Sequence, residues 1–134
     1  MNRLTDSLNF QAQALVLRAE RQRLIASNIA NADTPNYQAR DFNFADALKQ
    51  ATGQMSSNVT LATTEPGHLG ATGDGVGGQP RLMYATSSQT NLDNNSVDLD
   101  RERAAFAENS VKYQATLRFI GSDAKTLLTA ITGQ

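Results

Sequence analysis

Few residues of this 134-residue sequence could carry out chemistry. There is no cysteine, which excludes disulfides, thiolate metal sites and cysteine nucleophiles. The one histidine, His68, cannot form a multi-histidine metal site, and no fixed carboxylate cluster stands beside it. We interpret His68 as a structural loop residue, and we expect no enzyme activity, no cofactor and no metal.

The charged residues indicate no polyanionic partner. Four acidic residues gather between Asp98 and Glu108, but arginines interleave with them, which is typical of a solvated helix start with local ion pairs. Lys and Arg total 12 against 13 Asp and Glu, and the formal net charge is −1. Such a balance gives no electrostatic footprint for nucleic acid or an anionic membrane. We therefore expect protein partners, with no nucleic acid and no small-molecule substrate.

The sequence shows no recognisable targeting segment. No apolar run exceeds four residues, so neither a cleaved secretory signal nor a membrane-spanning helix is predicted. The lack of cysteine is compatible with a reducing cytosol and with an oxidising exterior alike. The residues alone leave two alternatives, a cytosolic protein or one exported through an uncleaved signal.

Composition divides the chain into two helical ends and a glycine-rich middle. Seven of the nine glycines lie between residues 53 and 78, where long helices are not expected. We predict a mainly α fold: long N- and C-terminal helices paired as a coiled-coil hairpin, with a small irregular or β-hairpin middle segment. The expected segments are 1–33, the N-terminal helix; 34–97, a turn, a short helix and the middle; and 98–134, the C-terminal helix.

The middle segment allows two interpretations. Residues 59–63 and 81–86 have β-like composition and could form a small hairpin around the glycine-rich run. The alternative is that residues 53–95 are a largely disordered linker, because they contain so few large apolar side chains.

The first 32 residues predict a long amphipathic helix. Its main apolar stripe recurs at three-, four- or seven-residue intervals and comprises Leu4, Leu8, Leu15, Ile25 and Ile29. A second, weaker stripe comprises Phe10, Ala14, Leu17 and Leu24. Small residues seven apart flank the main stripe at Ala12, Ala19 and Ala26. Two apolar faces indicate that this helix contacts more than one neighbour.

The C-terminal segment has the clearest periodicity in the sequence. Two heptad positions are apolar or small from 99 to 131: Leu99, Phe106, Tyr113, Ile120 and Leu127, and then Ser110, Leu117, Ala124 and Ile131. This spacing predicts a helix with a coiled-coil seam. We expect Asp98 as its N-cap, Gly133 at its end, and Gly121 to permit a close helix crossing or a bend.

The two helices are expected to bury their apolar stripes against each other or against other subunits. The expected packing residues are Leu8, Leu15, Ile25, Ile29, Phe106, Tyr113, Leu117, Ile120 and Leu127. A two-helix hairpin has no third element to cover its outer faces, so the chain is expected to be marginal alone and to complete its core with other chains. A heterologous contact of this kind would propagate into a filament.

The most distinctive local stretch is ASNIANADTPNYQAR, residues 26–40. Asn28 and Asn31 share a helix face near its end, where their amides could bond the last carbonyls or a neighbouring chain. Asp33-Thr34-Pro35 then stops the helix, because the residue before proline avoids helical backbone angles. Two interpretations stand: an ordinary helix end and turn, or an asparagine pair that fixes the register of packed helices.

Residues 24–35, LIASNIANADTP, resemble the N-terminal signature of the bacterial flagellar rod, hook and hook-associated axial proteins. Further stretches resemble the proximal rod members of that family: 37–42, 63–69, 95–102, 106–109 and 113–114. Asn36 departs from the frequent glycine, but asparagine tolerates left-handed backbone angles. The resemblance makes the signature turn a candidate site, consisting of Asn28, Asn31, Asp33, Thr34, Pro35 and Tyr37.

The resemblance implies a structural subunit of the basal-body proximal rod. Its terminal helices would polymerise into a hollow axle that transmits torque and passes exported subunits. The implied partners are copies of itself, FlgC-like and FliE-like rod proteins, and the membrane-ring and export-gate proteins at the rod base. Export by the flagellar type III apparatus without a cleaved signal, and a final place in the periplasm, are also implied. The residues alone leave open a soluble helical adaptor or export chaperone that binds partner helices through the same seam.

Overall fold

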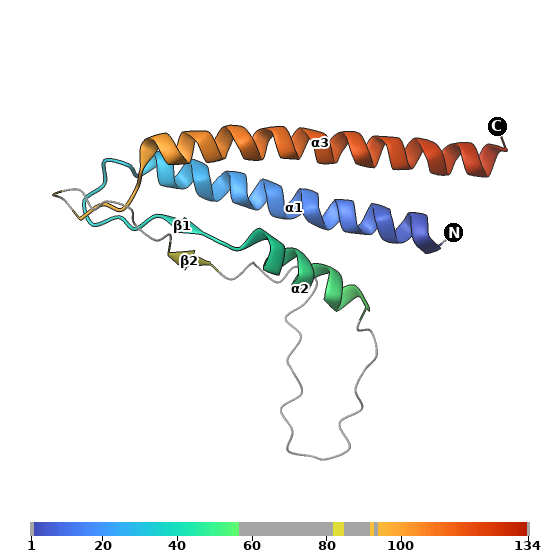
Figure 1. Cartoon of the computed structure of the whole chain (residues 1–134), viewed down its shortest axis with the longest axis horizontal. Helices are drawn as coiled ribbons and strands as arrows, with labels where there is room; N and C mark the ends of the chain where they lie inside the picture. The colour runs from blue at the N-terminus through green and yellow to red at the C-terminus, as the bar shows by residue number, and fades with distance from the viewer. Residues whose placement is uncertain (1, 57–81, 85–91, 93, 134) are drawn as a thin grey trace, which may run out of the picture.

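The computed structural model describes residues 2–56, 82–84, 92 and 94–133. The elements in chain order are α1 (Asn2–Ala30), β1 (Arg40–Asp41), α2 (Phe44–Ser56), β2 (Met83–Tyr84) and α3 (Leu99–Thr132). Figure 1 shows α1 and α3 side by side in opposite directions, with α2 on the other side of α1. The predicted pair of long terminal helices with a small sheet in the middle is confirmed, and α1 is the central element of the three helices.

α1 ends at the signature turn. The last helical residue is Ala30, and short-range hydrogen bonds then turn the chain, from Thr34 N to Asn31 O (3.0 Å) and from Tyr37 N to Thr34 O (3.3 Å). Asn36 has a φ of 61°, which confirms that asparagine serves at this left-handed position. The turn brings residues 37–42 back along α1.

Both predicted ends of α3 are confirmed. Asp98 is the N-cap, with its Oδ1 accepting from Arg101 N at 3.2 Å. Gly133 adopts a φ of 72° after the last turn, and its N–H donates to Thr129 O at 3.0 Å. A Cβ at Gly121 would meet nothing within 4 Å among the described residues, so no close helix crossing occurs there within the single chain.

The sheet has two short strands. β1 pairs antiparallel with β2, with Arg40 opposite Tyr84 and Asp41 opposite Met83. β2 falls inside the predicted stretch 81–86, but its partner β1 follows the signature turn and was not predicted as a strand. The other predicted strand, 59–63, and His68 lie outside the described residues.

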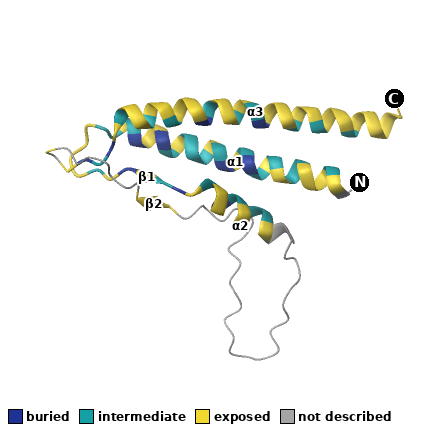
Figure 2. Cartoon of the chain, viewed as in Figure 1, coloured by how far each residue is buried: buried dark blue, intermediate teal, exposed yellow. Residues whose placement is uncertain are grey.

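The apolar core lies between α1 and α2. Leu17, Phe42 and Ala47 form its buried centre, and partly buried side chains pack around them: Leu24, Phe44, Leu48 and Ala51. The second stripe of α1 is thus a contact face, as predicted. Since α2 covers this face, the expectation that both outer faces of the hairpin stay uncovered is wrong here. Figure 2 shows that buried residues lie along α1 and on either side of β1, at Ala39 and Phe42, whereas α3 is largely exposed towards its C-terminus.

Candidate functional site

Asn28 joins the end of α1 to β1. Its side chain is 1% exposed, and its amide faces the Arg40 peptide: Nδ2 donates to Arg40 O at 2.8 Å, and Oδ1 accepts from Arg40 N at 3.1 Å. The Tyr37 hydroxyl donates to the same Oδ1 at 3.2 Å. The Asn28 amide therefore pairs with Arg40 as a neighbouring strand would, and it does not bond the last carbonyls of its own helix.

Asn31 acts within the turn itself. Its Nδ2 donates to Ser27 O at 2.8 Å, a carbonyl in the last turn of α1 that also accepts from Asn31 N at 3.1 Å. Its Oδ1 accepts from the Thr34 hydroxyl at 3.2 Å. The structure thus directs both signature asparagines to groups of the same chain, while Asp33 and Pro35 stand exposed at the outside of the turn.

Asn95, in the segment just before α3, bonds to the same turn. It is 0% exposed, and its Nδ2 lies within 3.0 Å of the carbonyls of Asn31, Ala32 and Thr34. Its Oδ1 accepts from Val97 N at 2.8 Å. Asn95 was not among the predicted site residues, although it begins the stretch 95–102 that resembles the family and stands three residues before an N-cap, a position suited to a local side-chain turn.

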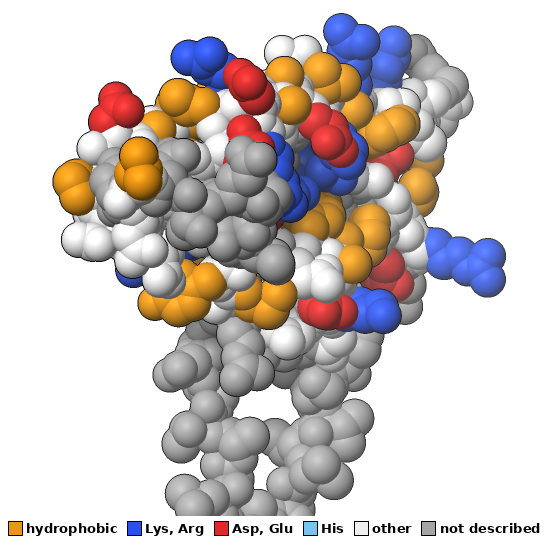
Figure 3. All heavy atoms as spheres, turned by 60° about the vertical axis from the view of Figure 1, so that its left-hand side comes forward, with side chains coloured by type: hydrophobic (Ala, Val, Ile, Leu, Met, Phe, Trp, Pro, Cys, Tyr) orange, Lys and Arg blue, Asp and Glu red, His pale blue; other side chains and the backbone are white. Residues whose placement is uncertain are grey.

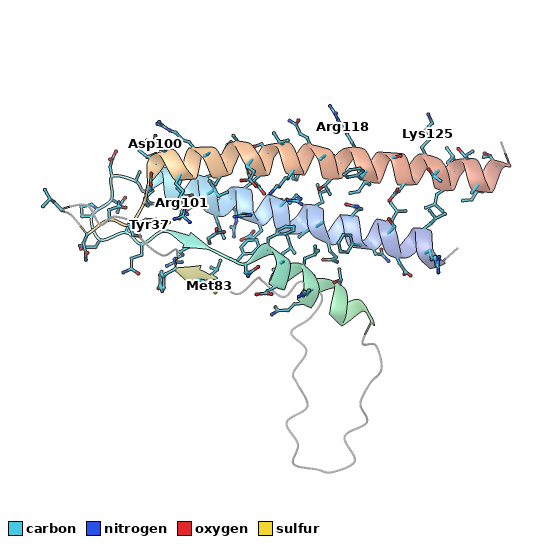
Figure 4. All side chains as sticks on the ribbon, viewed as in Figure 1. Tyr37, Met83, Asp100, Arg101, Arg118 and Lys125 are labelled. Atoms are coloured by element: carbon cyan, nitrogen blue, oxygen red, sulfur yellow. The ribbon has the colours of Figure 1, made fainter. Side chains whose placement is uncertain are left out.

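Ser96 adds a second link between the segment before α3 and the segment after the signature turn. Ser96 N donates to Tyr37 O at 3.0 Å, and Ala39 N donates to the Ser96 hydroxyl at 2.9 Å. Figure 4 shows Tyr37 at the end of the molecule where these segments meet. We call the hydrogen-bonded group of Asn28, Asn31, Tyr37, Asn95 and Ser96 the asparagine junction.

Charged side chains surround the asparagine junction. Arg21 Nη2 lies 3.3 Å from Asp41 Oδ2, which ties α1 to β1. Burial raises the pKa of Glu102 in the first turn of α3; a hydrogen bond with Asn28 opposes this, and the Asp41 charge adds to it. Figure 3 shows that acidic and basic groups alternate with hydrophobic ones over this end of the molecule. The arrangement holds segments together; its polar groups are used in structural hydrogen bonds.

The contact between α1 and α3 is polar at its centre. Asn109 is 3% exposed, and its Nδ2 donates to Arg18 O (2.9 Å) and Gln22 Oε1 (2.6 Å). Gln22 Nε2 donates in turn to Ser110 Oγ at 2.8 Å. Asn109 Oδ1 has no hydrogen-bond partner among the described residues, so this layer is not optimised for stability. We call Gln22, Asn109 and Ser110, with the Arg18–Thr116 pair, the polar layer.

Arg18 links all three helices. Its Nε donates to Thr116 Oγ1 on α3 at 3.1 Å, and its guanidinium carbon lies 4.5 Å from the centre of the Phe44 ring on α2. Burial lowers the pKa of Arg18, and the nearby Arg21 charge lowers it further. Farther along the pair, Ser7 Oγ donates to Asp123 Oδ2 at 3.0 Å, so polar links extend towards the N-terminus of α1.

The nine expected packing residues differ in burial. Ile25 is buried, and six are partly buried: Leu8, Leu15, Ile29, Tyr113, Ile120 and Leu127. Phe106 and Leu117 are 39% and 45% exposed. Because the buried residues of α3 are Asn109 and Thr116, the apolar seam of α3 is turned roughly 50° about the helix axis from the side facing α1, at 100° per residue.

Comparison with known proteins identifies the family. Residues 8–38, which contain most of α1 and the signature turn, match the model of the flagella basal body rod protein family. The chain is 43% identical over 136 residues to the flagellar basal body rod protein FlgB of Salmonella typhimurium, covering 99% of this chain and 98% of that protein. It is 42% identical over 134 residues to FlgB of Escherichia coli strain K12, covering 98% and 96%, and 42% identical to FlgB of Cereibacter sphaeroides over the whole of both chains.

The chain belongs to the FlgB family of flagellar basal body rod proteins. Its role is that of a structural component of the flagellar rod. Among the described residues, no helix has the length and apolar character needed to cross a membrane.

Proposed function

We propose that this chain polymerises through its terminal helices into the proximal rod, a hollow axle that transmits torque and lets exported subunits pass. One observation carries the proposal: α3, the longest helix, leaves large apolar side chains exposed along one stripe, namely Phe106, Leu117, Leu128 and Ile131. Contiguous exposed apolar surface marks interaction sites. In a rod, neighbouring subunits cover this surface.

The nine packing residues divide between two roles in this proposal. Those on α1 and the partly buried ones on α3 hold the hairpin, while Phe106 and Leu117 pack against a neighbouring subunit. The described parts of segments 1–33 and 98–134 thus form the axial core, and the described part of segment 34–97 lies outside it. Half-burial in the single chain supports this role, since such side chains lose their remaining exposure only when a further helix packs on them.

The signature turn is a stiffening element in this proposal. The asparagine junction ties α1, β1 and the start of α3 by hydrogen bonds between residues more than 50 positions apart in sequence. Torque applied to one helix then passes to the other at this end of the hairpin. The backbone carbonyls of Asn31, Thr34 and Tyr37 make this link by accepting from Asn95 Nδ2 and Ser96 N. The Asn28 side chain ties α1 to β1, while Asp33 and Pro35 shape the turn.

The partners and location follow from the family. We infer contacts with copies of the same chain, with FlgC-like and FliE-like rod proteins, and with membrane-ring and export-gate proteins at the rod base. The rod lies in the periplasm, which the subunit reaches through the flagellar type III apparatus without a cleaved signal. The chain acts mechanically in this proposal, with neither catalysis nor a cofactor.

Point variants on the exposed seam test the proposal. We expect Phe106→Ser and Leu117→Ser, expressed in a flagellated bacterium without its own copy, to abolish rods in purified basal bodies and swimming in soft agar. Met83→Ser, also an exposed apolar position, is the matched control and should leave both unchanged. Deletion of residues 1–10 or 125–134 should also abolish them. Normal swimming of the seam variants, with the protein absent from basal bodies, would instead support a soluble adaptor or export chaperone.

A further inference from the structure

A groove of about 460 Å³ lies along one side of the paired helices. α1 contributes Ala19, Gln22, Arg23 and Ala26 to its walls, and α3 contributes Ser110, Tyr113 and Gln114. The α1 wall therefore has two small side chains seven residues apart. By helical spacing, the exposed seam residues Phe106 and Leu117 extend the α3 wall in both directions.

The polar layer keeps this groove open. Gln22 on one wall is hydrogen-bonded to Ser110 on the other and to the buried Asn109 beneath them. If α3 rolled about its axis so that its apolar seam faced α1, the groove would close, but these buried amides would lose their partners. The hydrogen bonds thus keep the seam turned towards the groove.

The opposite side of α3 has the complementary shape. Val111 and Phe119 are 67% and 58% exposed and lie roughly 140° around the helix from the groove-lining residues. They are eight residues apart, about 12 Å along the axis, whereas Ala19 and Ala26 are about 10.5 Å apart. The two spacings along the axis thus agree to within about 1.5 Å, and Val111 and Phe119 lie roughly 80° apart around α3 on one broad face.

The charges select a register for this match. In one register, Val111 of the incoming α3 lies over Ala26 of the receiving chain, and its Phe119 lies over Ala19. The incoming helix then runs parallel to α3 of the receiving chain. Its Glu108, about 4.5 Å before Val111, is level with Arg103 of the receiving chain. Both side chains are exposed, and Glu108 pairs within its own chain only with Lys112, four residues away, among the described residues. Arg23 on the α1 wall is paired with Glu20 of its own helix at 2.7 Å, and Arg118 and Lys125 point away from α1 (Figure 4), so Arg103 is the basic group that this register places beside Glu108.

We propose that this groove docks α3 of a second copy of the chain, with Val111 and Phe119 over Ala26 and Ala19 and with Glu108 against Arg103. The inference rests on the proposed function, because it is in the rod that copies meet. The groove and the docking face lie on different sides of the molecule. The contact is therefore heterologous and repeats from copy to copy.

Disulfide trapping tests the packing, since the chain has no cysteine of its own. The variant Ala19→Cys/Phe119→Cys, oxidised in purified basal bodies, should give covalent dimers and higher multimers on non-reducing gels. An intrachain bond is not expected, because these two positions face different sides of the hairpin. The matched control Ala19→Cys/Lys49→Cys, which keeps the groove position but moves the second cysteine to the exposed side of α2, should stay monomeric.

Charge reversal tests the register. In the trapping variant, Arg103→Glu or Glu108→Arg alone should strongly reduce the cross-linked product, and the two together should restore it. Restoration shows that the single variants fold. Lys49→Glu, a reversal at an exposed position away from the groove, should leave the yield unchanged.

The outcomes separate this inference from the proposed function. If the protein is present in basal bodies and the trapping variant gives no multimers, or the double reversal restores nothing, the inference is overturned and the rod role stands. Multimers of equal yield from the control pair overturn it as well. If the wild-type protein is absent from basal bodies, the proposed function fails and the inference fails with it.

Discussion

The buried side chains at the centre of the α1–α2 contact are apolar, whereas the two side chains that α3 buries are an amide and a hydroxyl. The first contact is centred on Leu17, Phe42 and Ala47, and the second on Asn109 and Thr116. Burial of apolar surface is the dominant stabilising term, while a buried hydrogen bond adds about 1 kcal/mol net. The α1–α2 contact therefore has a fully buried apolar centre, whereas the α1–α3 contact combines a buried polar layer, which orients the long helices, with apolar side chains that are mostly only partly buried.

The difference suits a subunit that becomes rigid on assembly. A hairpin with an apolar seam would bury Phe106 and Leu117 internally, where a neighbouring subunit could not contact them. The polar layer instead orients α3 so that part of its seam stays outside. The four predictions below, in order of decreasing effect, test whether the two contacts differ in this way.

The largest effect is expected in the α1–α2 core. Leu17→Ala removes a buried side chain from the centre of the cluster and should lower the free energy of unfolding by about 2–4 kcal/mol, from lost transfer energy and the cavity left behind. Urea unfolding followed by circular dichroism measures this. The matched control is Leu128→Ala on exposed α3, where a change below about 0.5 kcal/mol is expected. Equal effects at the two sites would contradict the comparison.

The asparagine junction should rank second. Asn95→Ala leaves the carbonyls of Asn31, Ala32 and Thr34 without their shared donor in a buried place, at a cost of about 1–3 kcal/mol. Asn31→Ala, which removes a less buried helix cap, should cost no more than about 1 kcal/mol. The same unfolding assay compares the two variants. A larger loss of stability for Asn31→Ala would show that the hydrogen bonds of Asn31 within the turn contribute more than those of Asn95.

The polar layer should be nearly neutral for stability. Asn109→Leu removes hydrogen bonds but also an unpartnered buried Oδ1, so the free energy of unfolding should change by less than about 1 kcal/mol in either direction. Rod assembly should nevertheless fall, because α3 is then free to roll its apolar seam towards α1. A loss of stability as large as that of Leu17→Ala would mean that the polar layer also stabilises the hairpin.

The smallest effect is a pH dependence at Glu102. Because burial raises the pKa of Glu102 in the folded chain, its protonated form favours folding. This contribution is fully present below the ordinary carboxyl pKa of 4.5 and is lost as the pH rises through the raised folded value. Glu102→Gln should therefore gain stability relative to wild type as the pH rises, by less than about 1 kcal/mol given solvent screening. Thermal unfolding between pH 4 and pH 7 measures the difference, and a constant difference would contradict it.

Much of the local structure was predictable from the residues. The heptad spacing marked α3, the missing glycines and prolines marked α1, and Asp98, Gly133 and Asn36 occupy the cap and turn positions expected of them. Such features depend on neighbours a few positions away, so a pattern in the sequence is enough to identify them. The signature turn was recognised in the same way, from one contiguous stretch.

The partners of each face were decided by the tertiary structure. Asn95 lies more than 60 positions from Asn31, and nothing in its local sequence names the carbonyls that its amide reaches. The heptad pattern likewise showed that α3 has an apolar seam but not which way the seam faces. That orientation depends on long-range pairs such as Asn109 with Gln22, which form only once α1 and α3 lie side by side.

The sequence by itself thus determined that this chain has two long amphipathic helices, a capped turn between α1 and β1, and membership of a rod family. Only the tertiary structure decided that the apolar core forms against α2 and that α3 is oriented by amides with part of its seam exposed. The physical reason is that helix formation is local, whereas the rotation of a helix about its axis is chosen by whichever distant groups it buries.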